Sequence, residues 1–131
     1  MHESAELREL IAAMFRALSE GDADFFTRHL VNGPQLRLIG SAADEWFGGG
    51  EAFAMLRDQI AGGPGTITAS AEQIEAYADG DIGWAAAVVR YRAGERTVAG
   101  RETFVFRRSD GVWQLVQSHT SFPVDTESLF S

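Results

Sequence analysis

His119 is the side chain of this sequence best suited to proton transfer at neutral pH. It is the only histidine after residue 29, and a neutral imidazole is the most frequent general acid or base in enzymes. Strand alternation around it puts His119 on one face with Trp113 and Leu115. A packed, hydrogen-bonded histidine on that face is the favoured interpretation, and catalysis is the alternative.

A second set of candidate groups is the acidic pair Asp44 and Glu45, which directly precedes Trp46. A carboxylate beside an apolar side chain can serve as a general base. Solvated loop acids without a catalytic role are the simpler interpretation of the pair.

Metal and cofactor chemistry finds little support in the residue types. His2, His29 and His119 lack the spacing of a metal site. Asp79 and Asp81 flank a glycine in a predicted turn, where turn chemistry explains them. The chain has neither cysteine nor lysine, which excludes disulfides, thiolate catalysis and Schiff-base chemistry. We therefore predict no metal and no cofactor.

Charge and length narrow the class of protein. The net charge of -8 argues against nucleic acid as a partner, because phosphate binding requires a basic face. No apolar run approaches the roughly 20 residues that span a bilayer, and the first ten residues are charged where a secretion signal would be apolar. At 131 residues the chain has the length of one domain. The sequence predicts a single cytoplasmic domain that does not enter a membrane.

Helices are expected in the N-terminal half, where they would hold one side of any site. Apolar residues recur at helical spacing through residues 4–20, with Ser4 as the cap and Gly21 as the stop. Asp22 can cap a short second helix.

A more irregular stretch follows. Residues 35–39 are typical of a short strand, 40–50 of a loop, and 51–61 of a third helix. Glycine and proline at residues 62–65 break the pattern before the chain turns to strands.

Four long strands are predicted in the C-terminal half. They are residues 66–78, 82–92, 96–108 and 112–122. Short glycine-containing turns join them, so an antiparallel meander is expected. In the first strand the apolar residues change parity between Ala71 and Ile74, which predicts a β-bulge that bends the sheet.

This order of elements resembles the α+β cystatin-like cone of the nuclear transport factor two superfamily over nearly the whole chain. Residues 45–48, Glu-Trp-Phe-Gly, resemble the run before the third helix of SnoaL-like domains. The Gly-x-Trp at 111–113 and the His-x-Ser at 119–121 resemble the end of those domains. The tail, with Glu102-Thr103, is also similar to the association domain of calmodulin-dependent protein kinase. The resemblance implies one SnoaL-like domain over residues 1–131, with three helices in its N-terminal half packed on a strongly curved, mostly antiparallel sheet.

The resemblance also implies a pocket inside the cone and homodimerisation through the outer face of the sheet. Trp113 and His119 would lie on that outer face. The strand side chains on the other face of the sheet, together with residues of the segment before the third helix, would bind the ligand. The residues so predicted are Trp46, Phe47, Val89, Tyr91, Phe104, Phe106, Val116, Ser118 and Thr120.

The lining predicted in this way is apolar with a few hydroxyl groups. In the association domains, arginines line the pocket at positions that match Val89, Phe104 and Thr120 here. Without those arginines the pocket suits an uncharged, apolar or aromatic molecule.

The chain departs from ketosteroid isomerase, an enzyme of the same superfamily that uses a tyrosine and a protonated aspartate as oxyanion donors. Met14 and Phe15 stand where the tyrosine would be needed, and Phe104 and Phe106 where the aspartate would be. Two functions stay open. One is a homodimer whose pocket binds a small, mostly apolar molecule, with or without isomerase, cyclase or dehydratase chemistry. The other is a non-enzymatic association module with a packed cone.

Overall fold

The computed structural model describes residues 1–61 and 67–131. The predicted break at 62–65, and residue 66 at the start of the first predicted long strand, lie outside the described residues.

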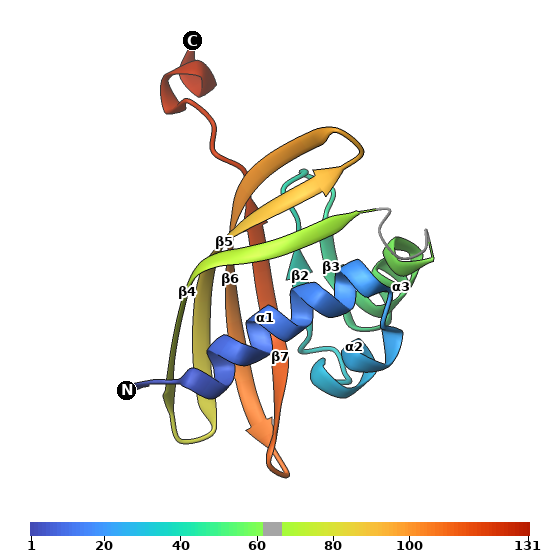
Figure 1. Cartoon of the computed structure of the whole chain (residues 1–131), viewed down its shortest axis with the longest axis vertical. Coiled ribbons are helices and arrows are strands. Elements are labelled where there is room, and N and C mark those ends of the chain that lie inside the picture. Colours follow the sequence, from blue (N-terminus) through green and yellow to red (C-terminus); the bar gives the residue numbers. More distant parts are fainter. Residues whose placement is uncertain (62–66) are drawn as a thin grey trace.

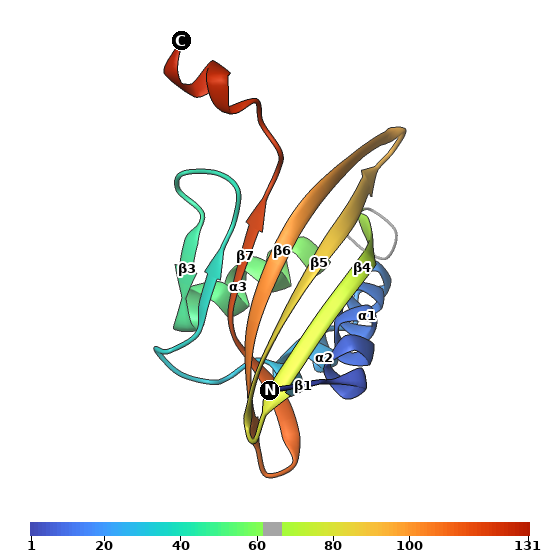
Figure 2. The ribbon, with the colours of Figure 1, turned by 90° about the vertical axis from the view of Figure 1, so that its left-hand side faces the viewer.

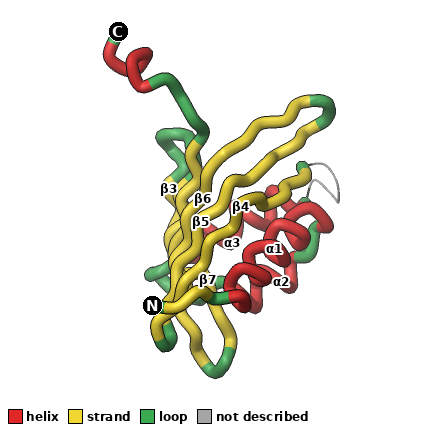
Figure 3. Tube along the Cα trace, turned by 60° about the vertical axis from the view of Figure 1, so that its left-hand side comes forward, coloured by secondary structure: helices red, strands yellow, loops and turns green. Residues whose placement is uncertain are grey.

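In this described part of the chain, three α-helices lie together on one face of a seven-stranded sheet (Figure 3). The helices are α1 (Ala5–Glu20), α2 (Ala23–His29) and α3 (Gly49–Ile60). The strands are β1 (His2–Glu3), β2 (Arg37–Ile39), β3 (Trp46–Gly48), β4 (Thr68–Asp79), β5 (Ile82–Ala93), β6 (Arg96–Ser109) and β7 (Val112–Ser121). Their order in the sheet is β1-β4-β5-β6-β7-β2-β3. Among the strands of the described residues, only β2 and β7 pair in parallel, so the predicted α+β cone with a mostly antiparallel sheet is confirmed.

The first helix begins and ends where its capping residues predict. The Ser4 hydroxyl accepts a hydrogen bond from the Leu7 amide at 3.1 Å, which satisfies a donor that the helix cannot satisfy itself. Gly21 ends the helix in the left-handed region, with a φ of 74°. None of the helices described is long and apolar enough to cross a bilayer.

Small residues under α1 allow it to lie close to the sheet. Gly83, Ala85 and Ala76 are on the concave face and are buried. A Cβ atom at Gly83 would collide with the Leu7 side chain and lie 3.0 Å from the Tyr77 carbonyl oxygen. The long strands curve around the helix that packs here (Figure 1).

The bulge predicted in the first long strand is confirmed. The register of β4 against β5 shifts between Glu72 and Glu75, and Gln73 has a φ of 49°. An extra residue in one strand bends it and increases its twist, which supports the curvature of the sheet.

A second bulge, which the sequence pattern does not reveal, lies in β7. Val105 of β6 pairs with Gln117, and the next residue, Phe106, pairs with Leu115. Val116 is therefore the extra residue. Side chains alternate strictly only while the register is continuous, so the alternation along β7 changes phase at Val116.

This phase change overturns one prediction. Trp113 is 4% exposed and packs on the helix side of the sheet, whereas His119 is exposed on the outer face. The expectation that Trp113 and His119 share the outer face is wrong for Trp113, because the bulge separates them. Ser118 and Thr120 lie on the concave face, on the wall of its cavity.

The prediction of a loop over residues 40–50 is confirmed for residues 40–45 and wrong for 46–50, because α3 already begins at Gly49 and a short strand precedes it. Residues 46–48 form β3, which pairs with β2 in an antiparallel hairpin beside the long strands (Figure 2). A strand of three residues is too short to give a readable alternation in the sequence. Trp46 points outward and is 61% exposed, and Phe47 lines the concave side.

After β7 the chain leaves the sheet and ends in the short 3-10 helix η1 (Thr126–Phe130), which stands apart from the rest of the molecule (Figures 1 and 2).

Candidate functional site

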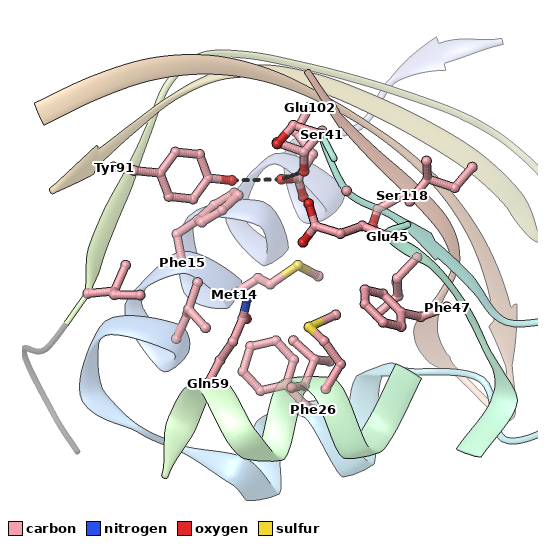
Figure 4. Close-up of a pocket in the computed structure, with 18 of the residues that line it drawn as sticks. Met14, Phe15, Phe26, Ser41, Glu45, Phe47, Gln59, Tyr91, Glu102 and Ser118 are labelled. Carbon is pink, nitrogen blue, oxygen red and sulfur yellow. Dashed lines mark hydrogen bonds between the residues drawn. The ribbon is translucent and has the colours of Figure 1, made fainter. Parts of the chain in front are cut away.

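A cavity of about 390 Å³ opens on the concave side of the sheet. Its wall comes from α1, α2, α3, the β2–β3 hairpin and the strands β5 to β7. Most of the lining side chains are apolar (Figure 4), among them Met14, Phe15, Leu18, Phe26, Phe47 and Met55. A concave, mostly apolar cavity of this size is typical of a small-molecule site.

Glu102 of β6 places a carboxyl group on the wall of this apolar cavity, and the residue is only 9% exposed. The Tyr91 hydroxyl donates a hydrogen bond to its Oε1 atom at 2.9 Å (Figure 4). The Thr120 hydroxyl donates to the same oxygen at 2.7 Å. Thr120 pairs directly with Glu102 across β6 and β7, so the sheet register holds this cluster together.

Burial governs the protonation of this cluster. It raises the pKa of Glu102 above the ordinary value of 4.5, and the hydrogen bonds from Thr120 and Tyr91 offset this only in part. Burial also raises the pKa of the Tyr91 phenol, and the charge of Glu102 reinforces that effect. Tyr91 therefore stays protonated, and Glu102 retains its proton at pH values where a surface glutamate has lost it.

A second carboxyl group reaches the cavity from the β2–β3 hairpin. Glu45 lies on the same wall as Glu102 and Ser118 (Figure 4) and is half-buried. Its Oε1 atom accepts the Ala42 amide at 2.8 Å, which holds the side chain in the hairpin. A Cβ atom at Gly40 would lie 2.7 Å from the Glu45 carboxyl carbon, so the glycine makes room for this side chain.

The residues predicted to bind a ligand separate into two groups. Phe47, Tyr91, Ser118 and Thr120 lie on the cavity wall, and so does the predicted base candidate Glu45. The others lie away from that wall, and they are Trp46, Val89, Phe104, Phe106 and Val116, as well as Asp44 and His119.

The predicted residues that do not line the cavity lie in the packed core or on the outer surface. Phe104 and Phe106 stack with centroids 6.1 Å apart, and Phe104 meets the edge of Phe15 at 6.2 Å. These two rings fill the narrow end of the cone. Val89 is buried too, but it pairs with Gly100, on the other side of Glu102 from Phe104. Trp46 faces outward below the Arg37 guanidinium, at 5.5 Å.

The two polar candidates outside the cavity are exposed. His119 lies on the outer face of the sheet, where it pairs with Ile39 of β2 and Thr103 of β6. Asp44 lies in the turn of the β2–β3 hairpin. Within residues 1–61 and 67–131, no cluster of three or more His, Cys, Asp or Glu side chains could hold a metal ion.

Sequence reasoning missed Glu102 as a site residue. It shares parity with Phe104 and Phe106, so an acid stands where the strand alternation calls for an apolar side chain. That interruption of the pattern is the signal that could have found it, because acids are rarely buried without a functional or structural reason.

A family model described as SnoaL-like domain matches residues 7–125. No curated protein sequence matches the chain.

Among solved structures, an NTF2-like protein of unknown function from Pseudomonas putida KT2440 is 22% identical, with a TM-score of 0.79; the match covers 95% of this chain and 89% of that one. A proposed dehydratase of the NTF2-like family from Streptomyces avermitilis is 17% identical, with a TM-score of 0.77, over 92% of this chain and 95% of that one. The association domain of CaMKII from C. elegans is 18% identical, with a TM-score of 0.74, over 88% of this chain and 92% of that one. At such identities the likeness shows a shared fold.

Proposed function

Since the chain belongs to the SnoaL-like family, whose fold by itself names no reaction, we propose that it binds a small, mostly apolar molecule inside the cone. The open cavity of about 390 Å³ carries this proposal. An association module with a packed cone would need side chains in that volume. Packing by Phe104 and Phe106 is confined to the narrow end, which favours a binding protein over such a module.

The shape and chemistry of the wall limit the ligand. Aromatic rings of Phe15, Phe26 and Phe47 line the cavity together with methionine and leucine side chains. Burial of apolar area contributes roughly 25 cal/mol per Å², so most of the binding free energy would come from apolar contact. The polar groups of Glu102 and Ser118 would orient the molecule.

Proton transfer is a second candidate activity at this site. Glu102 and Glu45 place two carboxyl groups on one cavity wall, and a positioned acid and base are what isomerisation, cyclisation and dehydration share. The likeness to a proposed dehydratase agrees with this candidate in fold only.

We also propose that two copies pair through the outer face of the sheet. On this face Trp84 stacks on Tyr77 with centroids 5.2 Å apart, and Val105, opposite Trp84, is 38% exposed. His119 lies on the same face, whereas the buried Trp113 does not contribute. Sedimentation of the wild type and of Val105→Lys tests the pairing. We expect the wild type to be a dimer and Val105→Lys to be a monomer. A monomeric wild type would contradict the proposed pairing.

The binding proposal is tested by thermal-shift screening of apolar metabolites against matched variants of α3. Met55 lines the cavity and its neighbour Ala54 is exposed. Met55→Arg should fold but lose ligand stabilisation, because a charged side chain would enter the apolar cavity. Ala54→Arg should retain it. If no ligand stabilises the wild type, or if Met55→Arg responds like the wild type, the cavity is not the binding site.

A further inference from the structure

We propose that Glu102 selects the ligand by donating a hydrogen bond from its carboxyl group to a carbonyl or hydroxyl oxygen of a neutral, otherwise apolar molecule. This inference depends on the proposed binding function of the cavity and goes beyond it by naming the ligand class.

The geometry of the carboxyl group leaves one oxygen for a ligand. Both protein hydroxyls, those of Tyr91 and Thr120, converge on Oε1. Within the described ranges, Oε2 has no hydrogen-bond partner, although Glu102 is largely buried and lines the cavity. A ligand that fills the cavity would enclose Oε2. Because an enclosed polar group without a partner is costly, a ligand oxygen at this position would be favoured.

The groups that face Glu102 do not compensate a negative charge. Among the described residues of α1 and α3, only apolar side chains and Gln59 line the cavity. Tyr91 is a neutral donor, and Glu45 brings a second acid from the hairpin. Arg92 lies at the exposed rim, where its Nε donates to the Gly94 carbonyl at 3.3 Å.

Without a cation beside it, a buried carboxyl favours its protonated form, and the raised pKa of Glu102 agrees with this. A protonated carboxyl is a hydrogen-bond donor. The cavity should therefore prefer a neutral acceptor to a carboxylate. If Glu102 were ionised instead, an apolar amine would be the preferred ligand.

Four naphthalenes of similar shape separate these possibilities: 2-acetylnaphthalene, 2-ethylnaphthalene, 2-naphthoate and 2-(aminomethyl)naphthalene. Isothermal titration calorimetry across acidic to alkaline pH measures their affinities. We expect the ketone to bind about tenfold more tightly than the ethyl compound, as one buried hydrogen bond allows, and the carboxylate to bind most weakly. The ketone should lose this advantage as the pH rises through the pKa of Glu102, because the ionised carboxylate cannot donate.

Variants assign the effect to Glu102. Glu102→Gln keeps a donor and removes the titration, so the ketone should retain its advantage at every pH. Glu102→Leu should bind the ketone and the ethyl compound equally. As a control, Asp44→Asn removes an exposed acid of the hairpin turn that does not line the cavity, and it should leave the pH dependence in place. Thermal unfolding checks that each variant folds, and if Glu102→Leu does not, the pH profile of Glu102→Gln decides the question.

Two outcomes overturn the inference while the cavity keeps its function: the amine binds the wild type more tightly than the ketone, or the pH profile of Glu102→Gln matches that of the wild type. A different result rejects the proposed function itself, and this inference with it. That result is either that none of the naphthalenes binds the wild type, or that Met55→Arg binds them as the wild type does.

Discussion

The narrow and the open end of the cone share the same strands but differ in what fills them. At the narrow end Phe104 and Phe106 are 1% and 0% exposed. Two positions from Phe104 along β6, at the same parity, Glu102 reaches the cavity with hydroxyl groups around it. Strand alternation brings all three side chains to the concave face, and the packing of the helices decides which of them are enclosed by side chains and which border a cavity.

Stability and binding therefore depend on neighbouring parts of one surface. Close-packed aromatic rings stabilise the narrow end. The open end keeps an unfilled volume and a buried acid, both of which lower the free energy of unfolding and are typical of functional sites. The contrast can be tested by substitutions at the two ends.

The largest effect is expected at the narrow end. Phe104→Ala should lower the free energy of unfolding by about 3–5 kcal/mol, because it removes a buried ring and leaves a cavity. Met55→Ala at the open end should cost less than about 1 kcal/mol, since its side chain borders a volume that is already empty. Urea unfolding measures both. Equal losses would mean that the two ends are packed alike.

A smaller effect is expected where α1 touches the sheet. Gly83→Ala should destabilise the protein by about 1–3 kcal/mol, because the new methyl group would press on Leu7 and on the Tyr77 carbonyl. As a control, a Cβ at Gly50 in the first turn of α3 would meet nothing within 4 Å, so Gly50→Ala should stabilise by about 0.5–1 kcal/mol. A tolerated Gly83→Ala would contradict the close approach of α1.

Glu102 should make the stability of the open end depend on pH. Its pKa is higher in the folded than in the unfolded chain, so the folded state holds the proton more tightly. Stability linked to this group is complete below the ordinary glutamate pKa and is lost as the pH rises through the raised one. Above that range Glu102→Gln should have gained stability relative to the wild type, compared with the difference between the two proteins at low pH.

The measurement is urea unfolding of both proteins at a series of pH values. The difference between the two, which cancels the contribution of all other groups, should grow with pH. A difference that stays constant would show that Glu102 titrates as it does in the unfolded chain.

The smallest effects distinguish two hydroxyl groups of β7. Thr120→Val removes a hydrogen bond to Glu102 and should cost about 1 kcal/mol. The Ser118 hydroxyl, which has no protein partner in the described ranges, borders the cavity, so Ser118→Ala should change stability by less than about 0.5 kcal/mol. Thermal or urea unfolding compares the two variants. Equal losses in the free energy of unfolding would mean that the hydrogen bond from Thr120 to Glu102 contributes no extra stability.

Much of the fold was predictable because its signals are local. The cap at Ser4, the stop at Gly21 and the turn at Asp110-Gly111 follow from backbone preferences of single residues. The β4 bulge was visible because apolar residues lie on both sides of it and change parity. The β7 bulge at Val116 was not, because neither face of that strand has a clear polar pattern from which a phase change could be read.

The helices, the long strands, their turns and the family could be derived from the sequence, since these depend on residue preferences and on spacing along the chain. Only the tertiary structure decided which side chains meet. The bulge at Val116 placed Trp113 inside and His119 outside, and the register of β6 with β7 joined Glu102 to Thr120. Glu102 meets Tyr91 of β5 and Thr120 of β7, which come from different parts of the chain. A cavity is a property of distant segments packed in space, and no local pattern encodes its volume or the pKa of an acid on its wall.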